Sequence, residues 1–164
     1  MNKKGFTLIE LLVVIAIIGI LASVVLAALN SARAKGADAA VKANLANTRA
    51  QAELFYGDNG NAYMVTAGTN TDVCNIAALV GSTKGVYPGV NAAATAYGAG
   101  APNTTLGTAG AWDIATCHSI ATAWAAEAPL KASTVGTPLM YCVDNTGASK
   151  VESAAMIGGA TACL

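Results

Sequence analysis

The stretch that decides the fold is MNKKGFTLIE (residues 1–10), which leads without a break into LLVVIAIIGILASVVLAAL (residues 11–29). The second run has no charged residue and predicts an apolar α-helix. Counted from Phe6, such a helix would be about 36 Å long at roughly 1.5 Å per residue, enough to span a bilayer core of about 30 Å. Glu10 is the exception, because it places a carboxylate on a helix that is otherwise suited to lipid.

Two ordinary explanations account for this start only in part. A secretory signal peptide has a short apolar stretch and then a small-residue cleavage site, whereas this run is longer and continues into helix-forming sequence. A plain signal anchor accounts for everything except Glu10. Its carboxylate costs several kcal/mol near the membrane unless it lies at the interface or finds a partner.

A cut between Gly5 and Phe6 would explain the glutamate. It would create a new α-amine four residues before Glu10 in the chain. On one helix the ammonium and the carboxylate are a turn apart, but between staggered neighbouring helices they could meet directly. Only the assembled form would then offset the cost of burying the charge.

The segment KKGFTLIE closely resembles the processing site of type IV pilins and of type II secretion pseudopilins. The resemblance covers residues 1–35. It implies a membrane-embedded prepilin peptidase that cuts after Gly5 and methylates the amine of Phe6, and it implies that Glu10 serves processing and subunit docking. Many members carry a proline late in the apolar helix. Here Gly19 is the only local weak point, so any segment that melts on assembly is expected just after it.

The sequence after residue 29 becomes amphipathic, and we expect one helix from about Phe6 to Tyr56. Asp38 and Lys42 form a favourable i,i+4 pair on its surface. The turn-forming residues 57–61 end the helix. One face carries residues spaced by four, three, four and three, as expected for a core stripe: Val41, Leu45, Thr48, Ala52 and Phe55.

The remaining sequence predicts a small, loop-rich head. Residues 72–80 are a candidate short helix, and residues 87–110 have little patterning and are expected to form a long surface loop. Strands are expected at 116–126, 138–144 and 149–153, in an antiparallel sheet of three or four strands. The fold class is therefore α+β, with a long N-terminal helix packed on a small antiparallel sheet, which is also what the resemblance implies.

Four cysteines support this head, because its alanine-rich sequence offers little side-chain area for a core: Cys74, Cys117, Cys142 and Cys163. Beyond a membrane segment, an even number of separated cysteines indicates disulfides in an oxidising compartment. A metal site or free thiols are the alternatives, but the usual zinc spacing is missing. Three connectivities are open, and the nearest-neighbour pairs Cys74–Cys117 and Cys142–Cys163 are slightly favoured.

The sequence shows no catalytic motif and predicts no enzyme, no cofactor and no metal site. The loops 58–61 and 144–147 each carry one carboxylate, whereas calcium needs six to eight oxygen ligands, so both are interpreted as turns. His118, the only histidine, is interpreted as structural. The formal net charge is zero, so no nucleic-acid partner is expected.

Four segments are expected: a leader at 1–5 removed by the peptidase, a membrane and assembly helix at 6–29, an amphipathic second half at 30–56, and a disulfide-stapled head at 57–164. Lys3 and Lys4 place the N-terminus in the cytoplasm before export of the head. After assembly the chain is expected in an extracellular filament.

The expected function is that of a major pilin, a structural subunit that polymerises into a helical surface filament. Its expected partners are copies of itself, the prepilin peptidase, the membrane, and an assembly platform driven by a cytoplasmic ATPase. A pseudopilin of a type II secretion or competence system is the nearest alternative. A membrane-anchored binding domain or enzyme belongs to a different class and leaves Glu10 unexplained.

Overall fold

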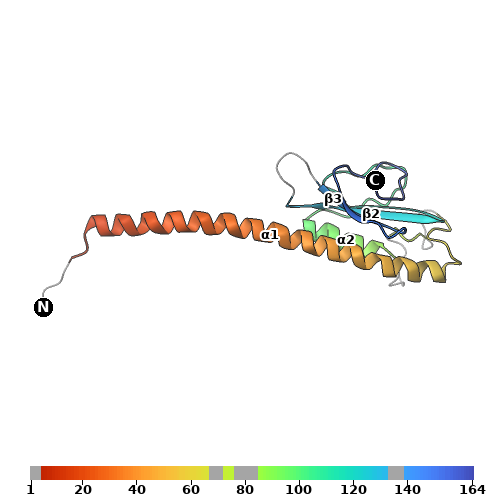
Figure 1. Ribbon diagram of the computed structural model, residues 1–164, viewed down its shortest axis with the longest axis horizontal. Helices are drawn as coiled ribbons and strands as arrows, with labels where there is room; N and C mark the ends of the chain where they lie inside the picture. The colour runs from red at the N-terminus through yellow and green to blue at the C-terminus, as the bar shows by residue number, and fades with distance from the viewer. Residues whose placement is uncertain (1–4, 67–71, 76–84, 133–138) are drawn as a thin grey trace.

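The long helix predicted from the sequence is continuous in the computed structural model, where α1 runs Leu8–Asp58 (Figure 1). The structure describes residues 5–66, 72–75, 85–132 and 139–164. The first half of α1 projects from the head as a single rod, and the second half lies along the head (Figure 1). At about 1.5 Å per residue the helix is roughly 76 Å long.

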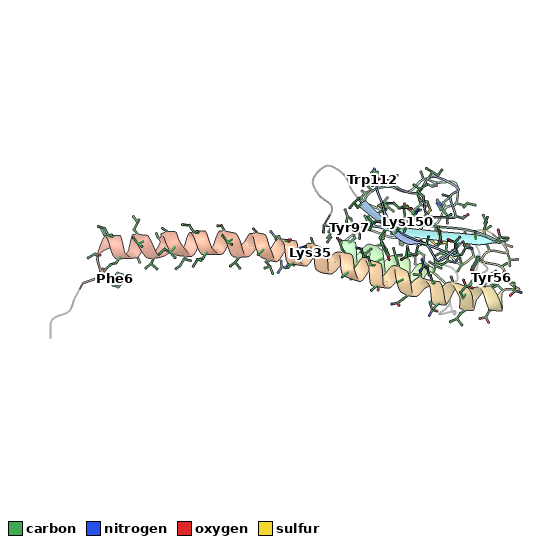
Figure 2. All side chains as sticks on the ribbon, viewed as in Figure 1. Phe6, Lys35, Tyr56, Tyr97, Trp112 and Lys150 are labelled. Atoms are coloured by element: carbon green, nitrogen blue, oxygen red, sulfur yellow. A yellow bond between two sulfur atoms is a disulfide. The ribbon has the colours of Figure 1, made fainter. Side chains whose placement is uncertain are left out.

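The two halves of α1 differ in what surrounds them. Residues 5–33 are exposed throughout, and their side chains radiate from the rod (Figure 2). The second half buries the predicted stripe and one further residue: Asp38, Val41, Leu45, Thr48, Ala52 and Phe55. The prediction of a core-facing stripe is therefore confirmed, and the helix also ends in the predicted place, where the backbone N–H of Asn59 donates to the carbonyls of Phe55 and Tyr56.

The head contains an antiparallel sheet of four strands in the order β1-β2-β3-β4. The strands are β1 Thr116–Ile120, β2 Ala123–Leu130, β3 Leu139–Asp144 and β4 Ser149–Glu152. One face packs on α1 and on a second helix, and the other is covered by the end of the chain (Figure 1). The α+β architecture of a long helix on a small antiparallel sheet is confirmed.

The prediction of one strand over 116–126 was wrong, because this segment is a hairpin. Ile120 pairs with Ala123, so the chain reverses over Ala121 and Thr122. These two residues lack the Gly, Asn or Asp chemistry that marks a tight turn, so alternation alone could not reveal the reversal. β2 then continues through Pro129, which lies beyond the last β1 partner and so costs no β1–β2 hydrogen bond.

The prediction of a long loop over 87–110 was also wrong, because α2 runs Tyr87–Tyr97 beside α1 (Figure 1). Pro88 lies in its first turn, and Gly98 ends it with a φ of 94°. The buried residues of α2 are Tyr87, Val90, Ala93 and Ala94, and three small side chains give only a weak periodic signal.

Gly89 sets how closely the two helices approach. A Cβ at this position would lie 2.3 Å from Cγ2 of Thr48 and 3.1 Å from the carbonyl oxygen of Asn44, both on α1. Any other residue here would therefore require a shift of the Thr48 side chain or of one of the helices.

Asp38 was expected on the surface as a partner of Lys42, and this prediction was wrong. Its carboxylate is buried and accepts the backbone N–H groups of Lys131 at 2.6 Å and Ala132 at 3.0 Å, just past the end of β2. Lys42 instead lies over the ring of Tyr141, 5.7 Å from its centroid. Asp38 thus joins the middle of α1 to the sheet.

Two disulfides join distant parts of the head, Cys74–Cys117 and Cys142–Cys163. The first fastens the segment after α1 to β1, and the second fastens the end of the chain to β3. Of the candidate short helix at 72–80, residues 76–80 lie outside the described part of the chain. Asp72 forms an isolated bridge with Met64.

Asp144 holds the same C-terminal region through hydrogen bonds. Its carboxylate accepts the N–H groups of Thr146 at 2.9 Å, Ala148 at 3.1 Å and Cys163 at 3.0 Å, together with the Thr146 hydroxyl at 2.7 Å. Burial alone would raise the pKa of this carboxyl, but the donors, with Cys163 first, lower the pKa below its ordinary value.

Gly89→Ala should lower the free energy of unfolding of the full chain in detergent micelles by about 2 kcal/mol, because the new methyl overpacks the contact between the helices. Gly36→Ala is the matched control, because Gly36 is exposed on α1 and has open space around it. It should stabilise by about 1 kcal/mol through helix propensity. Equal effects in denaturant titrations would contradict the close contact.

Asp144→Ala should lower the free energy of unfolding by about 2 kcal/mol at neutral pH, because four donors lose a charged acceptor. Because the folded-state pKa is lowered, this stability is present above the unfolded pKa of about 3.9 and is lost as pH falls through the folded-state pKa. In thermal unfolding experiments, the unfolding temperatures of the unmodified chain and of Asp144→Ala should therefore approach each other as the pH is lowered. Asp113→Ala, at an exposed aspartate, should change little at any pH, and a similar loss there would contradict a specific role for Asp144.

Candidate processing and assembly site

The candidate site lies where the extended start of the chain enters α1. Thr7 is the N-cap, with φ −85° and ψ 149°, and α1 begins at the next residue. The backbone N–H of Glu10 donates to Oγ1 of Thr7 at 3.3 Å, and the backbone N–H of Thr7 donates to Oε2 of Glu10 at 2.9 Å. This reciprocal pair is a capping box, which satisfies donors that a helix N-terminus leaves without intrahelical partners.

Glu10 therefore has a local partner, Thr7, within its own chain. Its Oε2 also accepts the hydroxyl of Thr7 at 2.7 Å, so two donors from one residue hold the carboxylate. A negative charge at a helix N-terminus is further favoured by the helix dipole. Within the described chain the structure thus brings Glu10 to Thr7, one turn away, and the hydrogen bonds to its carboxylate come from Thr7 and not from Phe6.

Thr7 is the residue of this site that the sequence interpretation missed. The signal was present, because Thr7 and Glu10 stand in the T-x-x-E spacing of a capping box directly before an apolar run. The cost of Glu10 in lipid and its expected roles in processing and docking do not by themselves indicate this cap.

Gly5 and Phe6 are both exposed, so the peptide bond between them is accessible from outside. Phe6 is 78% exposed and lies at the free end of the rod (Figure 2). A Cβ added at Gly5 would meet nothing within 4 Å. The fold of this chain therefore does not require glycine there, and such a requirement would have to come from a partner that binds this segment.

The helix beyond the site is long and apolar enough to cross a membrane. Its large apolar side chains are exposed on all sides, from Leu8 at 87% to Leu29 at 42%. A helix that is apolar all round needs an apolar environment, either lipid or other helices.

The candidate metal ligands in the described residues are engaged in other ways. Cys142, Glu152 and Cys163 lie close together, but both sulfurs belong to the disulfide. The carboxylate of Asp144 is surrounded by N–H and O–H donors, the opposite of what a cation needs. His118 is buried in the sheet with both ring nitrogens next to backbone carbonyls, which agrees with a structural role.

Comparisons with known proteins identify the same end of the chain. Residues 1–26 match the family described as the prokaryotic N-terminal methylation motif. The type IV wide pilus major component PilA4 of Thermus thermophilus is 40% identical over 80 residues, which cover 46% of this chain and 61% of that protein. The chain thus matches less than two thirds of this relative's length. No solved structure matches the chain.

The matched residues 1–26 include Gly5, Phe6, the capping box and the start of the apolar helix, and the relative is named as a pilus component. The long helix on a small antiparallel sheet is the architecture that this motif implies. The chain therefore carries the prokaryotic N-terminal methylation motif at its start and is similar, over 80 residues, to a type IV pilus component.

Proposed function

We propose that this chain is the precursor of a major pilin, a structural subunit without enzymatic activity that polymerises into a type IV pilus. One observation carries the proposal: a single carboxylate, Glu10, stands at the entrance of a fully exposed apolar helix that the head leaves uncovered. A plain anchor needs the apolar helix but not the carboxylate. A subunit that must dock in one register needs both.

Maturation removes residues 1–5. A prepilin peptidase cuts between Gly5 and Phe6 and methylates the new amine of Phe6. The exposure of both residues and the open space at Gly5 support this step, because a peptidase must bind the segment in an extended form. Cleavage leaves Thr7 in place, so the helix cap survives processing.

Residues 6–29 store the subunit in the cytoplasmic membrane as a single span. Lys3 and Lys4 favour an N-terminus on the cytoplasmic side and a head on the other side. Extraction into water would expose the whole apolar rod, at roughly 25 cal/mol per Å² of apolar area, so the helix must pass directly from lipid into a bundle of other helices. An assembly platform driven by a cytoplasmic ATPase supplies the work.

Assembly then changes the partner of Glu10. In the stored subunit the carboxylate is held by Thr7, as in the structure. In the filament it pairs with the methylated amine of Phe6 on a neighbouring subunit, and the low dielectric of the bundle strengthens that pair. Apolar burial is insensitive to stagger, so this ion pair selects the register. The contact is heterologous and does not close, as a filament requires.

Residues 30–56 carry the head, and residues 57–164 form it. Two observations favour a major pilin over a pseudopilin of a type II secretion or competence system. The relative that the chain matches is itself named as a major pilus component. The Cys142–Cys163 disulfide closes a C-terminal loop, which resembles pilins more than major pseudopilins.

Gly5→Val should leave the head folded, because a side chain at Gly5 meets nothing, and should block cleavage. Mass spectrometry of membranes should then find a chain that begins at Met1 without N-methylation. The unmodified protein should begin at methylated Phe6 and be abundant in material sheared from the cell surface. Gly36→Ala is the control and should be processed normally. Efficient processing of Gly5→Val would contradict the cleavage assignment.

Glu10→Gln and Thr7→Ala separate the two roles of the carboxylate. Glutamine can still accept hydrogen bonds from Thr7 but has no charge for a neighbour's amine, so Glu10→Gln should insert in the membrane and lose filaments at least tenfold. Thr7→Ala weakens the cap by about 1 kcal/mol and should keep most filaments. Counting filaments by electron microscopy distinguishes the two variants. A normal number of filaments from Glu10→Gln would contradict the docking role.

A further inference from the structure

The end of the chain is fastened over the outer face of the sheet by ionisable side chains from three strands. Glu127 on β2 accepts the N–H of Met156 at 2.8 Å. A ring nitrogen of His118 on β1 lies 3.0 Å from the carbonyl oxygen of Ala160. Asp144 on β3 holds the N–H of Cys163, as described above. The three side chains belong to buried residues. The strand register places them on one face of the sheet, the face that also carries Ala125 and Cys142 under Met156.

Glu127 is the least compensated of these groups. It is fully buried, and among the described residues its Oε1 has a hydrogen-bond partner whereas its Oε2 has none. Oγ1 of Thr116, directly opposite in the sheet, also makes no hydrogen bond within the described part of the chain. Gly110 packs directly against this carboxylate, because a Cβ there would lie 2.2 Å from Oε1 of Glu127. A buried carboxylate with a single neutral donor is costly as an anion and much less costly when protonated.

The negative charge of Glu152 also favours the protonated form of Glu127. Glu152 on β4 is nearly buried, and Lys150 reaches its Oε1 only at 3.6 Å. Burial raises the pKa of Glu127 to about 7, the N–H of Met156 opposes the rise, and the negative charge of Glu152 adds to it. Asp144 and His118 lie on the same face, at the register positions next to Glu127 and its partners.

His118 joins β1 to the same part of the chain. Its two ring nitrogens each lie 3.0 Å from a backbone carbonyl oxygen, that of Ala160 and that of Thr108. A ring N–H can donate to one of these carbonyls.

We propose that residues 153–162 form a proton-controlled latch, which is seated on the sheet while Glu127 carries a proton and is loosened when Glu127 is charged. The Cys142–Cys163 disulfide and the ionised Asp144 hold the far end at neutral pH. Opening is therefore local, and it uncovers the layer around Met156 and Ala125. The latch works within the head, whether or not the chain polymerises.

The pH range of the latch follows from the raised pKa. A carboxyl whose pKa is higher in the closed form stabilises that form fully below its unfolded pKa of about 4.3, and this contribution is lost as pH rises. Opening should become more favourable by up to about tenfold per pH unit from about pH 4.5 to about 7, and should then level off.

Hydrogen exchange with mass spectrometry on the full chain in detergent micelles tests this proposal. Samples from about pH 5 to about pH 9 cover the range, with uptake corrected for the intrinsic exchange rate at each pH. Uptake in residues 153–162 should rise up to about pH 7, while uptake in residues 41–52 of α1 stays constant. The Glu127→Gln variant should stay protected with no such rise, because glutamine still accepts from Met156 and cannot ionise.

Glu152→Gln provides a second test, also for the case that Glu127→Gln does not fold. Removing the negative charge of Glu152 lowers the pKa of Glu127, so the rise in uptake should end at a lower pH than in the unmodified chain. A pH-dependent rise that persists in Glu127→Gln, or a Glu152→Gln profile identical to that of the unmodified chain, would overturn the proposal.

Discussion

The rest of the structure depends on one constraint: a single continuous helix must serve two surroundings. The first half of α1 is apolar on every side and exposed, whereas the second half is apolar only on the stripe that faces the head. The stripe, the close contact at Gly89 and the buried carboxylate of Asp38 fix the head rigidly on that second half. Force applied to the head would therefore reach the apolar half through the helix itself, which suits a subunit held in a fibre by that half.

The sequence predicted those elements correctly that are specified by the spacing of apolar residues or by turn residues nearby in the chain. The stripe follows from spacing alone, and β3 and β4 were predicted to within a residue because turn residues separate them. It failed where the deciding contact is tertiary. The hairpin between β1 and β2 turns over Ala121 and Thr122, which have no turn signal. Helix α2 is specified by its contact with α1 through small side chains, and Asp38 by backbone groups 93 and 94 residues further along the chain.

The candidate site could be predicted from the free-energy cost of placing a charged side chain on an apolar helix. Glu10 stands out because a carboxylate is unfavourable on an apolar helix, and the structure gives this carboxylate a local partner in the capping box with Thr7. No similar argument could have found Glu127 and His118 together. They share a layer only because the strand register places them on one face, and because the end of the chain folds back over them.

Cryo-electron microscopy of filaments sheared from cells tests the central claim most directly. The account predicts a core made of the first halves of α1, density that begins at Phe6, and the carboxylate of Glu10 within bonding distance of the Phe6 amine of a neighbouring subunit. A core built from the heads, a chain that still begins at Met1, or a Glu10 that faces solvent in the assembled fibre would contradict it.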